Sequence, residues 1–79
     1  MKVSVLFFGA TAAVTNKRQL QVDESEEARA KQVFDQLLAE YPGLTSHRLL
    51  FSINQEYATG DEILRDGDEL AVFTEVSGG

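Results

Sequence analysis

Short stretches in which apolar and polar residues alternate predict strands, because successive side chains of a strand point to opposite faces. Residues 1–8 form the first stretch, with Val3, Val5 and Phe7 on one face and Ser4, Leu6 and Phe8 on the other. One of these faces must cover the core. The other still carries Leu6 and Phe8, which makes it unusually apolar for a face turned to solvent.

Later stretches repeat the alternation. We expect strands at residues 19–22, 48–53 and 70–74, and a short strand at 56–58. Within the last strand, Leu70, Val72 and Thr74 share one face, and Ala71 and Phe73 share the other. Residues 10–18 are small and polar, so we expect a connecting turn there, with the first two strands paired as a hairpin.

One amphipathic helix separates the second strand from the third. Its apolar residues have the spacing of a single buried stripe, formed by Ala30, Val33, Phe34, Leu37, Leu38 and Tyr41. Pro42 and Gly43 end the pattern, and residues 44–47 are expected to form a loop. The acidic cluster at residues 23–27 comes just before the stripe. We therefore expect its Asp or Ser side chains to cap the helix.

Two polar segments precede the last strand. Residues 61–64 are predicted to form a turn of helix or an extended link that places Ile63 and Leu64 beneath the sheet. Residues 66–69 are a strong turn signal and lack the spacing of a calcium loop. The resulting order of elements is that of the β-grasp, or ubiquitin-like, fold. This α+β fold has a mixed sheet, with its terminal strands paired in parallel at the centre and one helix across a face.

We expect one domain at residues 1–74 and a tail at residues 75–79 that ends in Gly78 and Gly79. At a glycine usage of roughly 7%, such a final pair arises by chance in about one chain in 200. Two residues without a Cβ form a stem that passes through narrow spaces, and the last one offers an unhindered carboxylate.

Composition narrows the possible functions. The 79 residues include no cysteine, which removes disulfides, thiol catalysis and thiolate metal sites. The net charge of −6 disfavours nucleic acid and favours a partner with a basic surface. The apolar start is too short for a signal peptide or a membrane span, so we expect a cytoplasmic protein without a membrane partner. The single histidine, His47, is expected to be a surface residue.

Four segments resemble the small subunits of molybdopterin synthase, the sulfur carriers of molybdenum cofactor synthesis. They are residues 1–9, 52–55, 64–70 and 76–79. The resemblance covers essentially the whole chain, and the turn at 66–69 one strand before the final glycines is its most specific part. The apolar start at residues 6–8 favours this family over the related thiamine sulfur carriers. Family members often have proline just after the last strand, where this chain has Thr74 and Glu75, and a more mobile tail is the expected consequence.

The resemblance implies that Gly79 carries the chemistry and that Gly78 is a spacer. An adenylyltransferase like the ubiquitin-activating enzymes would use ATP to adenylate Gly79. With a sulfurtransferase, sulfur would then replace AMP. The resulting thiocarboxylate would donate sulfur for the dithiolene of molybdopterin inside the large catalytic subunit, in a heterotetramer. The chain itself is expected to bind no cofactor or metal and to supply no catalytic acid or base.

The second apolar face predicts where a partner docks. If the first and last strands pair, Phe8 and Phe73 lie side by side, and Leu6 and Ala71 extend the apolar surface. Such exposed clusters mark interfaces, with aromatic residues as anchors. From this face we expect Leu6, Phe8 and Phe73 to bind the partner, and the resemblance to the family adds Tyr57, Val76 and Ser77. The alternative is that Phe8 or Phe73 completes a small core.

Other functions fit the same residues. A ubiquitin-like modifier would be joined through Gly79 to lysines of other proteins by the same activation chemistry. A thiamine-type sulfur carrier would use the same terminal glycine. A plain binding module would use the apolar face alone, with the glycine pair incidental.

Overall fold

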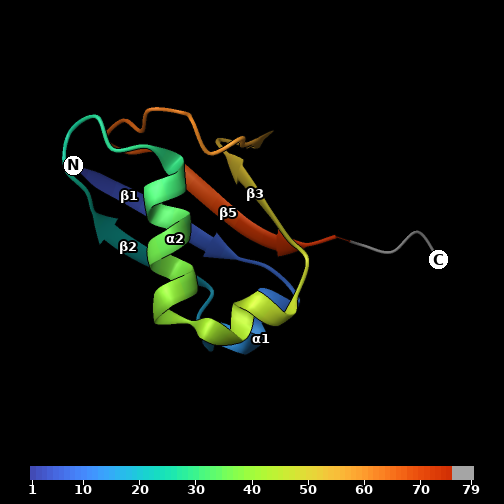
Figure 1. Ribbon diagram of the computed structural model, residues 1–79. Coiled ribbons are helices and arrows are strands. Elements are labelled where there is room, and N and C mark those ends of the chain that lie inside the picture. Colours follow the sequence, from blue (N-terminus) through green and yellow to red (C-terminus); the bar gives the residue numbers. More distant parts are fainter. Residues whose placement is uncertain (76–79) are drawn as a thin grey trace.

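Five strands form one mixed sheet, and the long helix α2 crosses one of its faces (Figure 1). The computed structural model describes residues 1–75. In chain order the elements are β1 (Lys2–Phe7), α1 (Ala10–Thr15), β2 (Gln19–Asp23), α2 (Ala30–Glu40), the 3-10 helix η1 (Pro42–Ser46), β3 (Leu49–Ile53), β4 (Glu56–Tyr57) and β5 (Glu69–Thr74). This is the α+β, β-grasp arrangement that the order of elements predicts.

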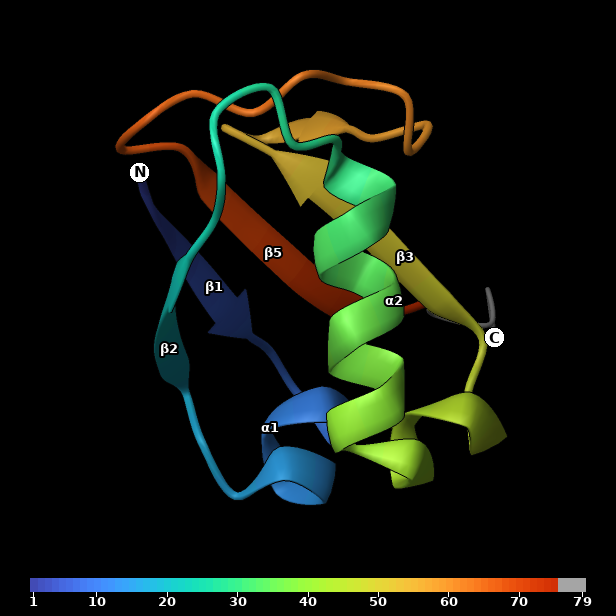
Figure 2. The ribbon, with the colours of Figure 1, turned by 60° about the vertical axis from the view of Figure 1, so that its left-hand side comes forward.

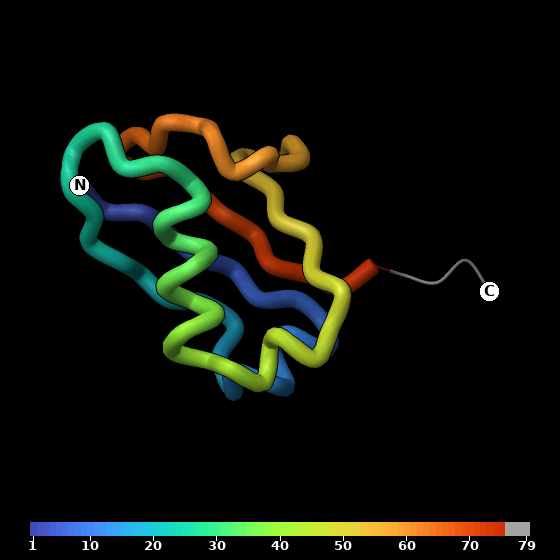
Figure 3. The backbone as a smooth tube through the Cα atoms, in the orientation of Figure 1, coloured from blue at the N-terminus to red at the C-terminus, as the bar shows by residue number. Residues whose placement is uncertain are grey.

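The strands lie in the order β2-β1-β5-β3-β4 (Figure 3). The two central strands, β1 and β5, are parallel, and Phe7 lies opposite Val72. The other neighbouring pairs are antiparallel. The predicted parallel pairing of the terminal strands and the predicted hairpin of β1 and β2 are therefore confirmed.

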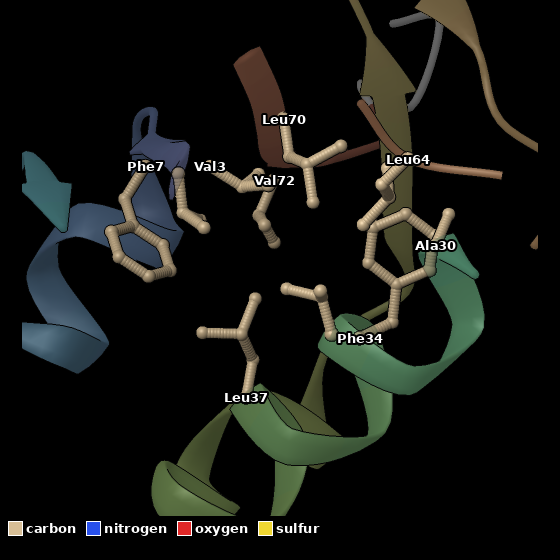
Figure 4. Packing of buried hydrophobic residues seen from close by; sticks show 10 residues of the cluster. Val3, Phe7, Ala30, Phe34, Leu37, Leu64, Leu70 and Val72 are labelled. Atoms are coloured by element: carbon tan, nitrogen blue, oxygen red, sulfur yellow. The ribbon is translucent and has the colours of Figure 1, made fainter. Parts of the chain in front are cut away.

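The core lies between the sheet and α2 (Figure 4). From the sheet it contains Val3, Val5, Phe7, Leu70 and Val72, and from α2 it contains Ala30, Val33, Phe34 and Leu37. The Phe34 ring stacks on Phe51 of β3 with 3.8 Å between the ring centroids. Alternation along the strands predicted the buried side chains of the sheet. The helical stripe is confirmed for Ala30, Val33, Phe34 and Leu37, whereas Leu38 and Tyr41 are only partly buried.

The segment expected to be a connecting turn contains a short helix, α1, so that prediction is wrong. Its two threonines are buried, and each hydroxyl finds a nearby backbone oxygen. The Thr15 hydroxyl donates to the Thr11 carbonyl at 2.9 Å, and the helix ends at Asn16, which has a φ of 58°. Helix α1 is stabilised by packing against β5 and η1 (Figure 2). With only six residues it has no apolar stripe from which the helix could be predicted. The 3-10 helix η1 at residues 42–46 likewise overlaps the loop that was expected at residues 44–47.

The acidic cluster does not cap α2, which begins after it. The N-cap residue is Arg29, whose N–H donates to the Gln32 side chain at 2.7 Å. The next two N–H groups, of Ala30 and Lys31, donate to the carbonyls of Glu62 and Gly60, both at 2.9 Å. A segment about thirty residues away in the chain therefore satisfies the helix start.

The connection from β4 to β5 runs along the start of α2. Ile63 forms a bridge with Arg29 and is 54% exposed, whereas Leu64 is buried. The prediction that both lie beneath the sheet is right only for Leu64, because the extended backbone turns them to opposite sides. The turn at residues 66–69 is confirmed, with a φ of 87° at Gly67.

Candidate docking face and carrier tail

The sheet face opposite α2 carries the side chains that alternate with the core residues. The register places Gln19, Leu6, Ala71, Ser52 and Tyr57 in one row across all five strands. Tyr57, at one end of this row, is 75% exposed. Leu6 and Ala71, at the centre of the row, are partly exposed.

A second row lies nearer the end of β5. The Phe8 N–H donates to the Val72 carbonyl at 3.1 Å, so the pairing of β1 with β5 continues to Phe8 and places it beside Phe73. Leu50 lies opposite Phe73 on the other side. Phe8 is 51% exposed, so it does not complete the core. The rings of Tyr57 and Phe73 have centroids 6.2 Å apart and join the two rows.

We call these six residues the apolar patch: Leu6, Phe8, Leu50, Tyr57, Ala71 and Phe73. The structure brings together the four predicted docking residues that it describes. Their role in binding a partner stays a prediction. Sequence reasoning missed Leu50, although the alternation that puts Leu49 and Phe51 on the core face places Leu50 on the other. The remaining predicted residues, Val76 and Ser77, lie outside the described residues.

A buried hydroxyl holds the backbone at Phe8. Thr11 is fully buried, and its Oγ1 lies 2.8 Å from the carbonyls of both Phe8 and Val72. The same oxygen accepts the Phe8 N–H at 2.9 Å. Gly9, with a φ of 57°, allows the chain to turn from β1 into α1 at this point. The backbone of Phe8, the residue that follows β1, is therefore held by hydrogen bonds to α1 and β5.

Two open hollows border the apolar patch. One of about 560 Å³ is lined by Leu6, Phe7, Phe8, Gly9, Ala12, Arg18 and Gln19. The other, of about 230 Å³, is lined by Ser52, Gln55, Tyr57 and Phe73. A surface with apolar ridges and adjacent hollows can receive the side chains of a second protein.

The last described residue, Glu75, is tied to the start of β3. Its N–H donates to the Arg48 carbonyl at 3.2 Å, and its carboxylate lies 3.6 Å from the Arg48 guanidinium. A proline at this position could not donate the backbone bond. The predicted carrier residue Gly79 and spacer Gly78 lie outside the described residues.

Among residues 1–75, no three His, Asp or Glu side chains are grouped to hold a metal ion. Glu62 has a pKa lowered chiefly by the Thr59 N–H, which donates to its carboxylate at 2.7 Å. Glu62 lies beside the start of α2, where its role is to hold the backbone. His47 is exposed at the end of η1, as expected.

No helix within residues 1–75 has the length and apolar character needed to cross a membrane.

Comparisons with known proteins place these features in a family. The model of the ThiS family matches residues 5–79. A molybdopterin synthase sulfur carrier subunit from Homo sapiens is 35% identical over 83 residues, which cover 99% of this chain and 94% of that protein. The predicted resemblance is thereby confirmed.

Solved structures share the fold. SAMP1 from Haloferax volcanii matches with a TM-score of 0.86 at 29% identity, covering 100% of both chains. A protein–protein complex of subunits 1 and 2 of molybdopterin-converting factor from Helicobacter pylori 26695 contains a chain that matches with a TM-score of 0.71 at 22% identity. The match covers 100% of this chain and of that one. These neighbours agree with the predicted β-grasp fold.

Proposed function

The chain belongs to the ThiS family, and we propose that it is the sulfur carrier subunit of a molybdopterin synthase. The observation that carries this proposal is the likeness along the whole chain to proteins of that name. The described residues fit the role of a carrier, because they form a folded support with an apolar patch beside the strand that leads to the tail.

The proposed chemistry takes place at the carboxylate of Gly79. A terminal carboxylate has a pKa of about 3.3 and is therefore ionised and a poor electrophile at neutral pH. A partner adenylyltransferase would activate it with ATP, forming an acyl adenylate and releasing pyrophosphate. Sulfur at the oxidation level of sulfide, delivered through a sulfurtransferase, then attacks the acyl carbon, so that the bond to AMP breaks and a thiocarboxylate is left. Acid, base and metal groups for these steps come from the partners.

The proposed acceptor of the tail is the large subunit of molybdopterin synthase, which uses the sulfur to build the dithiolene. The apolar patch would dock on that subunit and hold the tail in its active site. The Helicobacter pylori neighbour is in a complex with subunit 2 of molybdopterin-converting factor, and this supports such a partner. Docking of the folded domain would hold the short tail close to the active site of the partner, and such positioning speeds the transfer of sulfur from Gly79.

Peptide mass spectrometry tests the chemistry. The protein is produced together with its adenylyltransferase and sulfurtransferase and is digested, and the mass of its last peptide is measured. We expect the gain that corresponds to exchange of one oxygen for one sulfur at Gly79. The variant without Gly79 should lack this gain and keep the melting temperature of the parent, because the core lies within residues 1–75. An unmodified peptide in the presence of active partners would contradict the proposal.

Charge substitutions test the docking role of the patch. Phe8→Glu and Phe73→Glu should weaken binding to the large subunit without loss of the circular dichroism spectrum of the fold. Ile63→Glu is the matched control, because Ile63 is about as exposed as Phe8 but lies beside the start of α2. Equal weakening by all three variants, or by none, would exclude the patch as the docking site.

A second function, protein modification, is favoured by the likeness to SAMP1 at 29% identity. A further structure of a Haloferax volcanii protein with this fold is named small archaeal modifier protein 1. A modifier would form an isopeptide bond between Gly79 and lysines of other proteins. Peptides that carry this linkage on many proteins, found by mass spectrometry of cells, would favour the modifier over the carrier.

A further inference from the structure

The acidic residues gather at the end of the sheet where β1 and β5 begin. The carboxylate of Asp66 accepts the Lys2 N–H at 2.7 Å, and the Ser4 N–H donates to the Asp68 carbonyl at 2.9 Å. The Glu24 N–H donates to the Met1 carbonyl at 2.9 Å. Figure 1 shows the loop after β2 and the loop before β5 beside the N-terminal end of β1. The five carboxylates at this end belong to Asp23, Glu24, Asp66, Asp68 and Glu69, and they outnumber its cationic groups, which are the N-terminal ammonium and the side chains of Lys2 and Arg65.

Basic residues occupy the opposite end, beside the finish of β5. The Phe7 N–H donates to the Arg18 carbonyl at 2.9 Å, which places Arg18 and Lys17 next to the end of β1. Within residues 1–75, the ion pairs found do not include Lys17 or Arg18, and both are exposed. Arg48 lies at this end as well, facing Glu75. A chain with a net charge of −6 therefore has a cationic end where its tail begins.

The hollow of about 560 Å³ lies at this cationic end. Its apolar lining includes Leu6, Phe8 and Ala12, and its polar lining is Arg18 and Gln19. An apolar surface with a guanidinium beside it suits an apolar side chain followed by a carboxylate. The hollow is continuous with the apolar patch, because Leu6 and Phe8 belong to both.

We propose that the partner of the apolar patch presents carboxylates to Lys17 and Arg18 and places an apolar side chain in the hollow beside Phe8. This rests on the proposed function, so the partner is the large subunit of molybdopterin synthase. Basic residues of the same partner face the acidic end of the sheet. Because each end of the sheet meets a partner surface of opposite charge, the two proteins are oriented as they approach. If the carrier approached the other way round, like charges would face each other. The tail thus enters the partner from one direction.

Association kinetics with the large subunit test this proposal. Lys17→Glu/Arg18→Glu reverses the cationic end. The control Lys31→Glu/Arg65→Glu changes the net charge equally on exposed residues away from it. Rates are measured at ionic strengths of about 0.01 M and about 1 M, between which the Debye length falls from about 30 Å to about 3 Å. We expect the first double variant to associate about tenfold more slowly at low salt, with little difference at high salt. The control should change less than about twofold.

Dissociation rates separate a contact in the hollow from long-range attraction. Arg18→Ala should speed dissociation several-fold at both salt concentrations, whereas Lys17→Ala should alter association alone. Equal slowing of association by both double variants would overturn the inference, and so would an unchanged dissociation rate for Arg18→Ala. The proposed function would still stand in either case, provided that the parental protein binds the large subunit. A parental protein that does not bind the large subunit would overturn both.

Discussion

Phe7 and Phe8 are neighbours in the chain but lie on opposite faces of the sheet. Substitution of Phe7 by alanine should therefore reduce stability, and substitution of Phe8 should reduce partner binding. Phe7 is 3% exposed and meets the Tyr41 ring edge-on, with centroids 6.1 Å apart. Removal of a buried phenylalanine costs about 3–5 kcal/mol. A domain of this size has a free energy of unfolding of about 4–12 kcal/mol. Phe7→Ala should therefore lose a large part of its stability.

Phe8→Ala should mainly lose affinity. A phenylalanine side chain has roughly 200 Å² of surface, of which about half stays exposed in the free protein. Covering roughly 100 Å² in a complex contributes about 2.5 kcal/mol at 25 cal/mol per Å². Loss of that contribution corresponds to a roughly 60-fold higher Kd for the large subunit. Only about half of the Phe8 side chain is buried in the free protein, so Phe8→Ala should lose less stability than Phe7→Ala.

Urea denaturation and titration calorimetry with the large subunit measure the two effects. Phe7→Ala should show the lower denaturation midpoint, and Phe8→Ala should show the weaker binding at temperatures where it is fully folded. Binding of folded Phe8→Ala as tight as that of the parent would refute the docking role of Phe8. Equal denaturation midpoints for Phe7→Ala and Phe8→Ala would refute the assignment of the two rings to opposite faces.

Three further predictions concern stability. Thr11→Val should cost about 1–3 kcal/mol in urea denaturation, because it leaves buried backbone groups without their hydroxyl partner, and exposed Thr45→Val should cost less. An equal cost would show that the hydroxyl is dispensable. Gly67→Ala should cost about 1–2 kcal/mol through backbone conformation alone, since an added Cβ meets no atom within 4 Å; an unchanged midpoint would contradict this. Glu62 stabilises the fold above about pH 4.5, and this stabilisation disappears as pH falls through its lowered pKa. The parent should lose more stability than Glu62→Gln over that acid range in denaturation curves, and parallel curves would refute the assignment.

Local patterns predicted most of the fold, because they reflect which face of an element is buried. The alternation in residues 1–8 identified both the core residue Phe7 and the exposed Phe8. The stripe on α2 was equally direct, since Val33 and Leu37 are buried as their spacing predicts. Leu6, Phe8, Ala71 and Phe73 of the apolar patch followed from the same alternation once the first and last strands were paired, whereas Leu50 was missed.

The tertiary structure decided what depends on residues far apart in the chain. The start of α2 is set by carbonyls of Gly60 and Glu62, which no cap signal in the acidic cluster could reveal. Helix α1 depends on the burial of Thr11 against β5. The separation of charge is also a product of folding, because the loops that meet at the start of β1 come from distant parts of the sequence. By itself, the sequence determined the buried faces and the resemblance to a carrier family. Only the packing of distant segments determined where the helices begin and which charges border the docking face.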